Sequence, residues 1–268
     1  MPNKVYRKIL HMGIQNEMEY RTNYWIQLVS FFVPMMTQFF LWLAIFQSSG
    51  QGTIVGYTFQ EMLIYIIMAA VTGKLVAAGF EYEIAGDIKE GGLGKFLVQP
   101  LNYFAYRILK FLGAKAVQSV LVIVFAAVVL IWLRIGLHVP VGWDSALRYL
   151  IALPGALLLN FVIYYALSGI AFWLTESTGL FYTLSLIIYI ASGSVFPLTI
   201  FGETIAKLLG MLPFSYIVFF PVNMITGKLT PTEAVTGIGM QWLWIVVILL
   251  VARWVWSSGV RRYVAVGG

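Results

Sequence analysis

Between Gly179 and Thr226 the chain reads GLFYTLSLIIYIASGSVFPLTIFGETIAKLLGMLPFSYIVFFPVNMIT, with only two charged residues, Glu203 and Lys207. As one helix this stretch would extend roughly 72 Å, whereas the hydrocarbon core of a bilayer is about 30 Å thick. It is also divided by helix-breaking residues: Pro197, Gly202, Gly210, Pro213 and Pro221. Non-helical backbone survives at membrane depth only where it is buried in protein or lines a water-filled cavity. We therefore expect one crossing followed by short half-helices that turn back into the membrane, which favours transport over simple anchoring.

The composition indicates an integral membrane protein. The chain has 268 residues, of which 60% are hydrophobic and 10% charged, and its mean hydropathy is +0.87. Soluble domains carry about 25% charged residues. We expect residues 1–268 to form a single transmembrane domain of the all-α class. The net charge of +6 is not concentrated in one patch, so no nucleic-acid partner is expected.

Hydropathy predicts six transmembrane helices, and the Lys and Arg distribution predicts their orientation. Most basic residues fall on the side of the N-terminus, which places both termini in the cytoplasm. A seventh crossing would put Arg261 and Arg262 outside, so we reject it. The expected location is a cell membrane of the bacterial cytoplasmic type. The predicted crossings are Tyr24–Phe46, Tyr57–Phe80, Ala114–Leu133, Tyr149–Leu174, Phe181–Phe201 and Gly237–Trp256.

Residues 1–23 read as an amphipathic helix lying in the cytoplasmic interface. At the helical period, apolar residues gather on one side and basic or polar residues on the other, as in interfacial helices. The alternative is a plain basic segment that only fixes topology. The apolar side contains Val5, Tyr6, Ile9, Leu10 and Met12, and the other side contains Lys4, Arg7, Lys8, His11 and Gln15.

Residues 81–112 form the one sizeable loop, and its pattern predicts two helices. Phe80, Ile84 and Ile88 lie four residues apart, on one helix face. Gly91-Gly92 should end this helix, and Pro100 suits the start of the next. The acidic residues among 81–90 are interpreted as a solvated face. A loop of this kind suits a protein that receives force from a cytoplasmic partner.

The chain lacks the motifs of an energy source. No Gly-Lys pair has the flanking residues of a nucleotide-binding phosphate loop, so ATP hydrolysis would need a separate subunit. No Asp, Glu or His lies centrally in a predicted crossing, which argues against proton coupling. His11 and His138 stand alone, so neither a metal site nor a bound cofactor is expected.

Lys74 is the one charge deep within a predicted crossing. It could snorkel to the inner interface, or it could face a cavity and meet an anionic substrate group. Tyr189 and Phe196 could line the same path or pack against lipid. Small residues at every fourth position, Ala69, Gly73 and Ala77, are interpreted as a helix-packing stripe.

Three segments together resemble ABC-2-type permeases, the membrane subunits of ABC exporters. They are SGSVFPL from Ser192, LPFSY from Leu212 and PVNMITGK from Pro221. The run IKEGGLGKFLVQPL, from Ile88 to Leu101, is similar to the cytoplasmic loop of one subgroup, with Phe96 and Gln99 where tyrosine and arginine are commoner.

The resemblance implies a dimer of two identical or paralogous permeases, each bound to an ABC ATPase subunit that holds ATP and Mg. It implies that residues 203–228, with Pro213 and Pro221, form an external re-entrant hairpin. The fifth crossing, with the first, would line the dimer interface. It also implies a coupling helix that docks on the ATPase, comprising Glu83, Ile84, Asp87, Ile88, Lys89, Glu90, Gly91 and Gly92.

Three functions remain open from the sequence. The first is an ATP-driven exporter subunit, itself not an enzyme, that moves a hydrophobic or amphipathic substrate. The second is a gradient-driven transporter or channel without an ATPase. The third is a membrane-embedded scaffold, which would form complexes but move nothing.

Overall fold

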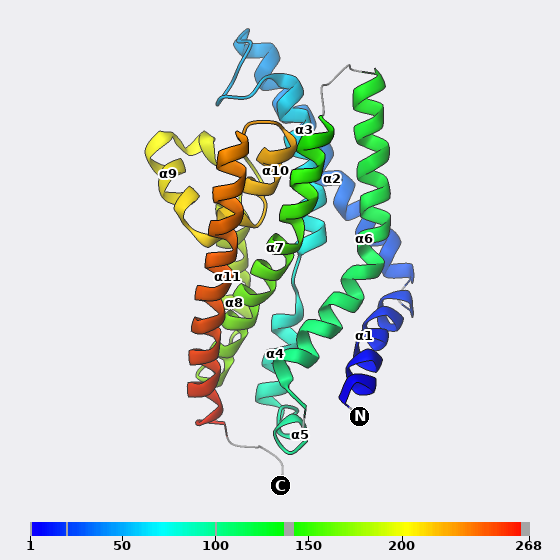
Figure 1. Cartoon of the computed structure of the whole chain (residues 1–268), viewed down its shortest axis with the longest axis vertical. Helices are drawn as coiled ribbons and strands as arrows, with labels where there is room; N and C mark the ends of the chain where they lie inside the picture. Colours follow the sequence, from blue (N-terminus) through cyan, green and yellow to red (C-terminus); the bar gives the residue numbers. More distant parts are fainter. Residues whose placement is uncertain (1, 20, 100, 137–141, 264–268) are drawn as a thin grey trace.

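The computed structural model describes residues 2–19, 21–99, 101–136 and 142–263, and no extended strand occurs among them. Figure 1 shows a bundle of long helices with α1, α5 and the end of α11 at one end, which we call the loop end. The helices are α1 Pro2–Glu19, α2 Arg21–Ser49, α3 Phe59–Val76, α4 Phe80–Lys89, α5 Gly94–Leu97, α6 Tyr103–Gly136, α7 Trp143–Ser168, η1 Gly169–Phe172, α8 Thr178–Ala191, η2 Leu198–Phe201, α9 Glu203–Met211, η3 Pro213–Tyr216, α10 Phe219–Ile225 and α11 Pro231–Val260.

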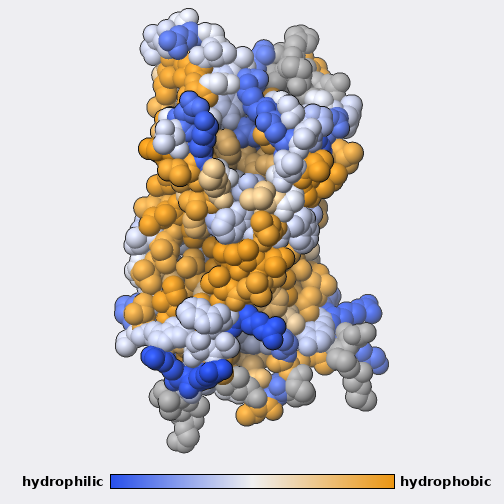
Figure 2. Space-filling view, turned by 60° about the vertical axis from the view of Figure 1, so that its left-hand side comes forward, coloured by the Kyte–Doolittle hydropathy of each residue, from blue (hydrophilic) through white to orange (hydrophobic). Residues whose placement is uncertain are grey.

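The described helices include five that are long and apolar enough to cross a membrane. Figure 2 shows a broad hydrophobic surface around the middle of the molecule, with hydrophilic residues towards both ends. These features confirm an all-α membrane protein. The five are Phe31–Ser49, Phe59–Lys89, Tyr103–Val129, Trp143–Phe172 and Pro231–Val260.

The fifth predicted crossing differs from its expected extent. We expected a helix from Phe181 to Phe201, but α8 ends at Ala191. Gly193 follows with φ +79°, a left-handed conformation that glycine adopts without strain, and Pro197 prevents the helix from resuming at once. At 14 residues α8 is about 21 Å long, which is shorter than a bilayer core. Six crossings therefore remain a prediction.

The second predicted crossing is broken near its end. Helix α3 stops at Val76, and α4 begins at Phe80 after Gly79, whose φ is +141°. The break leaves carbonyl groups at the end of α3 without a helical partner. The Val76 carbonyl oxygen finds one in Asn160, whose Nδ2 donates to it at 2.6 Å. Lys74 therefore lies in the last turn of α3, not about six residues inside a longer helix as we expected.

The N-terminal helix exists, as α1, and it packs closely along α6. Gly13 and Gly113 make the approach possible, since a Cβ at Gly113 would lie 2.4 Å from the Leu10 carbonyl oxygen. The apolar side is only partly covered: Ile9 is buried, whereas Val5 and Met12 are exposed. A position in the membrane interface remains a prediction for this helix.

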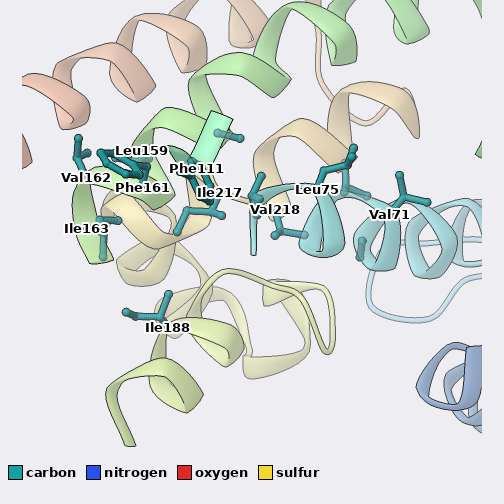
Figure 3. Packing of buried hydrophobic residues seen from close by; sticks show 14 of the residues in the cluster. Val71, Leu75, Phe111, Leu159, Phe161, Val162, Ile163, Ile188, Ile217 and Val218 are labelled. Carbon is teal, nitrogen blue, oxygen red and sulfur yellow. The ribbon is translucent and has the colours of Figure 1, made fainter. Parts of the chain in front are cut away.

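The core lies between α3, α6, α7 and the segment that precedes α10. Figure 3 shows Phe111, Leu159 and Phe161 packed together, with Ile217 and Val218 between them and α3. These buried residues are all apolar, as expected for the core of a bundle of membrane helices. The core thus fixes α3 against α7.

Residues 203–228 form two short helices joined by η3, which agrees with the expected half-helices. Helix α9 has no buried residue, whereas every residue of α10 from Phe220 onward is buried. Pro213 begins η3 and Pro221 lies in the first turn of α10, where a missing N–H is tolerated. Figure 1 places both helices near the end opposite α5. Their re-entry into the membrane remains a prediction.

Candidate functional site

A cavity of about 290 Å³ lies between α2, α3 and the turn that follows α8. Its wall is largely apolar, with a lysine, a glutamine and hydroxyl groups as its polar members. The lining residues are Phe31, Pro34, Met35, Gln38, Tyr65, Ile66, Ala69, Ala70, Gly73, Lys74, Ala77, Tyr189, Ser194 and Val195. We call it the first cavity.

A second cavity of about 410 Å³ lies between the end of α3, α7 and α8. Its wall is richer in polar groups and includes the carboxylate of Glu81. Only 3% of Glu81 is exposed, and its Oε2 accepts a hydrogen bond from the Gly79 N–H at 2.8 Å. The other polar lining residues are Tyr82, Asn160, Tyr164, Tyr182, Ser185, Tyr189, Ser192 and Ser194.

The two cavities meet at one strip of small residues on α3. Both are lined by Gly73, Ala77, Tyr189 and Ser194. A Cβ added at Gly73 would meet only the Ser194 Oγ, at 4.0 Å. The backbone of α3 at Gly73 therefore borders the two cavities directly. The stripe that we interpreted as helix packing therefore lines the cavities, since Ala69, Gly73 and Ala77 all belong to the first one.

The wall opposite α3 is the glycine turn, by which we mean residues 192–194. The Tyr65 hydroxyl donates to the Gly193 carbonyl oxygen at 2.6 Å. The Phe219 N–H donates to the Ser192 carbonyl oxygen at 2.8 Å. The turn is thus tied to α3 on one side and to the start of α10 on the other, which fixes the shape of the first cavity.

Two of the three predicted path residues come together, and one does not. Lys74 and Tyr189 both line the first cavity. Phe196 lines neither cavity, and its ring instead packs against Trp42, with centroids 6.5 Å apart. A role of these three residues in transport or in a dimer interface stays a prediction.

A cluster of ion pairs joins α4 to α6, and its centre is Arg107. The guanidinium donates to Glu83 Oε2 at 2.7 Å through Nη1 and to Asp87 Oδ2 through Nη2. Its Nε donates to the Tyr103 hydroxyl at 2.9 Å, and that hydroxyl donates to Asp87 Oδ2 at 2.7 Å. Lys110 adds a second cation on Glu83, with its Nζ at 2.7 Å. We call these five residues the Arg107 cluster.

The guanidinium at the centre of this cluster is buried and held in one orientation. Arg107 is only 4% exposed, so its charge depends on the two carboxylates rather than on water. Two carboxylates on one guanidinium also fix its orientation, because the guanidinium is planar and rigid. The cluster therefore ties α4 to the first part of α6.

The eight residues expected to dock on an ATPase divide into buried and accessible members. Ile84 and Ile88 are buried, as their spacing predicted, and Asp87 faces α6. The interpretation of the acidic residues as a solvated face is wrong for Glu81 and Asp87. Lys89 donates to the Ser177 hydroxyl at 3.0 Å. Of the remaining members, Glu83 and Glu90 are exposed and Gly91 and Gly92 are half-buried.

The glycine pair explains how the segment turns at the end of α4. Gly91 has φ +80°, and a Cβ at Gly92 would lie 3.0 Å from Asp87 Oδ1. The chain then enters α5, and several side chains in and just after this helix are exposed. Val98 is 84% exposed, an unusual degree for an apolar residue, and Lys95 and Gln99 are exposed beside it.

The connection before α8 lies beside α4. Thr178 donates from its backbone N–H to Glu176 Oε1 at 2.8 Å. Hydrogen bonds from Thr178, followed by attraction to Lys89, hold the pKa of Glu176 below its ordinary value. Glu176 therefore remains ionised at neutral pH and extends the charged surface of the loop end.

Sequence reasoning missed Arg107, Lys115 and Glu81 as functional candidates. Arg107 was counted only as a basic residue that sets topology. The spacing of Glu83 and Asp87 was a usable signal, because two acids four residues apart share a helix face and need a cation. Nothing in the sequence showed that Glu81 would face a cavity, since that depends on the break at Gly79.

The described residues contain no group of three or more His, Asp or Glu side chains that could hold a metal ion. The polar side chains of the two cavities also lack the paired ligands that a divalent cation would need. The arrangement instead offers mostly apolar walls in both cavities, with Gln38 and Lys74 among the polar groups of the first and several hydroxyl groups in the second. Such walls suit the binding of an amphipathic molecule.

Comparison with known families matches residues 32–267 to the family described as ABC-2 family transporter protein. No curated protein and no solved structure matches the chain. The family match covers most of the sequence and agrees with the apolar helical bundle. Family members are transport components of the membrane and act with ABC ATPase components. The chain therefore belongs to the ABC-2 transporter family, as one of its membrane-spanning permeases.

Proposed function

We propose that this chain is the permease subunit of an ATP-driven exporter for a hydrophobic or amphipathic substrate. The observation that carries the proposal is the meeting at Gly73 of two mostly apolar cavities, the second of which is also rich in hydroxyl groups. A molecule with an apolar body and a polar head would find a matching surface in each. Lys74 and Glu81 lie on opposite sides of this junction and would contact polar or charged groups of the head.

The route of force runs from the loop end to the cavity wall. Helix α4 is joined to α6 through the Arg107 cluster, and only the three residues Ala77–Gly79 separate it from α3. A push on the loop end would therefore act on the strip of α3 that contains Gly73. Since the Lys and Arg distribution favours a cytoplasmic loop end, the push would come from an ATPase subunit that binds ATP and Mg.

The surface that contacts the ATPase comprises the exposed side chains around α5, together with the accessible members of the predicted coupling helix. Val98 would supply an apolar anchor, and Glu90 and Lys95 would supply charged contacts around it. Ile84 and Ile88, which are buried, would transmit the movement instead of touching the partner. The assembly would pair this chain with a second permease, identical or paralogous, in the bacterial cytoplasmic membrane.

One observation favours a second candidate, a gradient-driven transporter without an ATPase. Glu81 is a buried carboxylate beside a polar cavity, which is a usual feature of proton-coupled carriers. This candidate predicts transport driven by a pH gradient and lost in Glu81→Gln. The exporter predicts transport that needs ATP and the ATPase and continues without a gradient.

Reconstitution in liposomes separates the two candidates. Vesicles would hold the permease alone or the permease co-expressed with the ABC ATPase of the same genome, and a panel of fluorescent amphiphiles would report movement. The exporter predicts movement only with the ATPase, ATP and Mg. Movement by the permease alone under a pH gradient would contradict it, and a stable complex without any movement would favour a scaffold.

A further inference from the structure

A small cavity of about 170 Å³ lies between the break after α3 and the neighbouring part of α6. It is separate from the two cavities of the proposed path, although Ala77 borders all three. Three cations line it, Arg107, Lys110 and Lys115, against the single carboxylate of Glu83. We call it the basic cavity, and its lining carries an excess of positive charge.

Lys115 is the one of these three cations that lies in no ion pair among the described residues. Glu83 is already held by Arg107 and Lys110, each at 2.7 Å. The Lys115 ammonium donates to two neutral oxygens, the Lys74 carbonyl at 3.2 Å and Gln118 Oε1 at 3.0 Å. Among the residues that the structure describes, Lys115 forms no ion pair with a carboxylate.

Burial makes this arrangement costly without a ligand. Lys115 is only 6% exposed, and its ammonium has two oxygen acceptors and the face of the Phe111 ring, whose centroid lies 5.6 Å away. The Glu17 carboxylate attracts the ammonium electrostatically without an ion pair and accepts a hydrogen bond from the Gln118 amide at 2.7 Å. A buried charge without a close counter-ion lowers the stability of the fold, so an anion bound in the cavity would stabilise the protein.

The start of α4 also borders the cavity, but a carboxylate of the protein already lies there, so the attraction for a further anion comes from the cations. Gly79 and Phe80 line the cavity, and they stand at the N-terminus of the ten-residue helix α4. The Glu81 carboxylate accepts a hydrogen bond from the Gly79 N–H at 2.8 Å and so already occupies part of this helix start. Helix N-termini favour phosphate and other anions because their N–H groups and the helix dipole both point to the ligand.

The position of the cavity along the bundle indicates where such an anion would come from. Helix α3 has 18 residues and is about 27 Å long, close to the thickness of a bilayer core. The basic cavity at its end therefore lies at a membrane boundary, the level of lipid phosphates. On α6, Leu112 and Val120 are exposed on either side of Lys115 in sequence and offer apolar surface to acyl chains.

We propose that the basic cavity binds the phosphate group of an anionic membrane phospholipid, with Lys115 as the central contact. Basic pockets between transmembrane helices on the cytoplasmic side are suited to such headgroups. The bound phosphate would bridge α6, the end of α3 and the start of α4. Lipid composition would thereby influence the same joint that connects the loop end to the cavities.

Native mass spectrometry of the full-length purified chain tests the proposal. The protein would be stripped of lipid and then offered phosphatidylglycerol or phosphatidylcholine with the same acyl chains. We expect clear retention of phosphatidylglycerol only. Loss of a charge-assisted contact should lower that retention about tenfold or more in Lys115→Gln. Lys115→Arg, which keeps the charge, and Lys207→Gln, at an exposed site, should retain it.

A smaller loss is expected in Lys110→Gln, which removes a more accessible cation and remains informative if Lys115→Gln does not fold. Equal retention of the two lipids by the wild type, or unchanged retention of phosphatidylglycerol in Lys115→Gln, would overturn the proposal. Excess inorganic phosphate distinguishes the source of the phosphate group. Retention of phosphatidylglycerol in its presence supports the lipid, whereas displacement would assign the site to soluble phosphate and overturn the lipid assignment.

Discussion

The Arg107 cluster and the glycine turn each tie neighbouring helices together, and they do so by opposite means: the cluster joins α4 to α6, and the turn joins α3 to the start of α10. At the loop end, a buried guanidinium pairs with two carboxylates and a tyrosine hydroxyl. At the glycine turn, neutral groups do the same work, with Tyr65 bonded to Gly193 and Phe219 bonded to Ser192. The glycine turn borders the space around Gly73, whereas the Arg107 cluster borders the separate basic cavity.

The difference reflects the surroundings of the two regions. Neutral hydrogen bonds satisfy buried backbone groups without placing a net charge among apolar helices, so they suit the middle of a bundle. Paired charges cost more to bury, but they impose one geometry and fail sharply when a partner is lost. We infer that the loop end is built to transmit movement and the glycine turn to preserve the shape of a cavity.

The largest expected effect comes from Arg107→Ala. This change leaves Asp87 without its cation, while the more exposed Glu83 keeps Lys110, so it should destabilise the protein by about 3–4 kcal/mol, the lower part of the range for a broken buried pair. It should also uncouple α4 from α6, so ATPase activity would no longer drive transport. Denaturant unfolding in detergent measures the first effect.

Lys207→Ala is the matched control for Arg107→Ala, because it removes a cation from a highly exposed ion pair with Glu203. Such surface pairs contribute about 0–1 kcal/mol. A loss in Arg107→Ala that is no greater than in the control would show that the cluster does not join α4 to α6.

A smaller but still large effect is expected for Gly193→Ala. The new Cβ would meet the Tyr65 hydroxyl at 2.8 Å and the Phe219 Cβ at 2.9 Å, at a backbone φ of +79°. Left-handed strain and overpacking together should cost about 2–4 kcal/mol. Thermal unfolding followed by circular dichroism measures this loss.

The control for the glycine turn is Gly210→Ala in α9. A Cβ there meets nothing within 4 Å, and alanine favours a helix over glycine by up to about 1 kcal/mol. This variant should be as stable as the wild type or slightly more stable. Equal stability of the two alanine variants would contradict the account of a turn that requires glycine.

A modest effect is expected for Tyr65→Phe. The change removes the hydroxyl that donates to the buried Gly193 carbonyl at 2.6 Å and should cost about 1–2 kcal/mol. Urea unfolding of this variant beside Tyr182→Phe, whose ring is exposed, isolates the hydrogen bond. No difference between the two would remove Tyr65 from the contacts that hold the turn.

Particular residues show how far the sequence predicts this structure. Apolar length predicted the long helices, and the spacing of Ile84 and Ile88 predicted a buried face of α4, because periodicity and hydropathy are local properties. The break at Ala77–Gly79 was missed, since the run from Tyr57 to Phe80 is mostly apolar up to its last residue and its break depends on Asn160 and Lys115 from other helices.

The candidate site was predicted only in part for the same reason. Lys74 and Tyr189 were identified as unusual residues within apolar segments, and both line the first cavity. Phe196 is an aromatic residue of the same predicted crossing as Tyr189, but its ring packs against Trp42. Arg107 appeared as one basic residue among many until the fold brought two carboxylates to it.

The central claim is that substrate passes Gly73, and one measurement tests it most directly. Gly73→Leu places a side chain at the junction of the two cavities, and its Cβ meets only Ser194 Oγ, at 4.0 Å, so the backbone of α3 need not move to accept it. Gly239→Leu places the same side chain on exposed α11, where nothing lies within 4 Å. Both variants should fold and bind the ATPase.

In proteoliposomes with the ATPase and ATP, we expect Gly73→Leu to lower movement of a fluorescent amphiphile that the wild type transports by about tenfold or more. Gly239→Leu should transport like the wild type. Transport by Gly73→Leu at the wild-type rate, with its fold intact, would contradict the claim that the two cavities form the path.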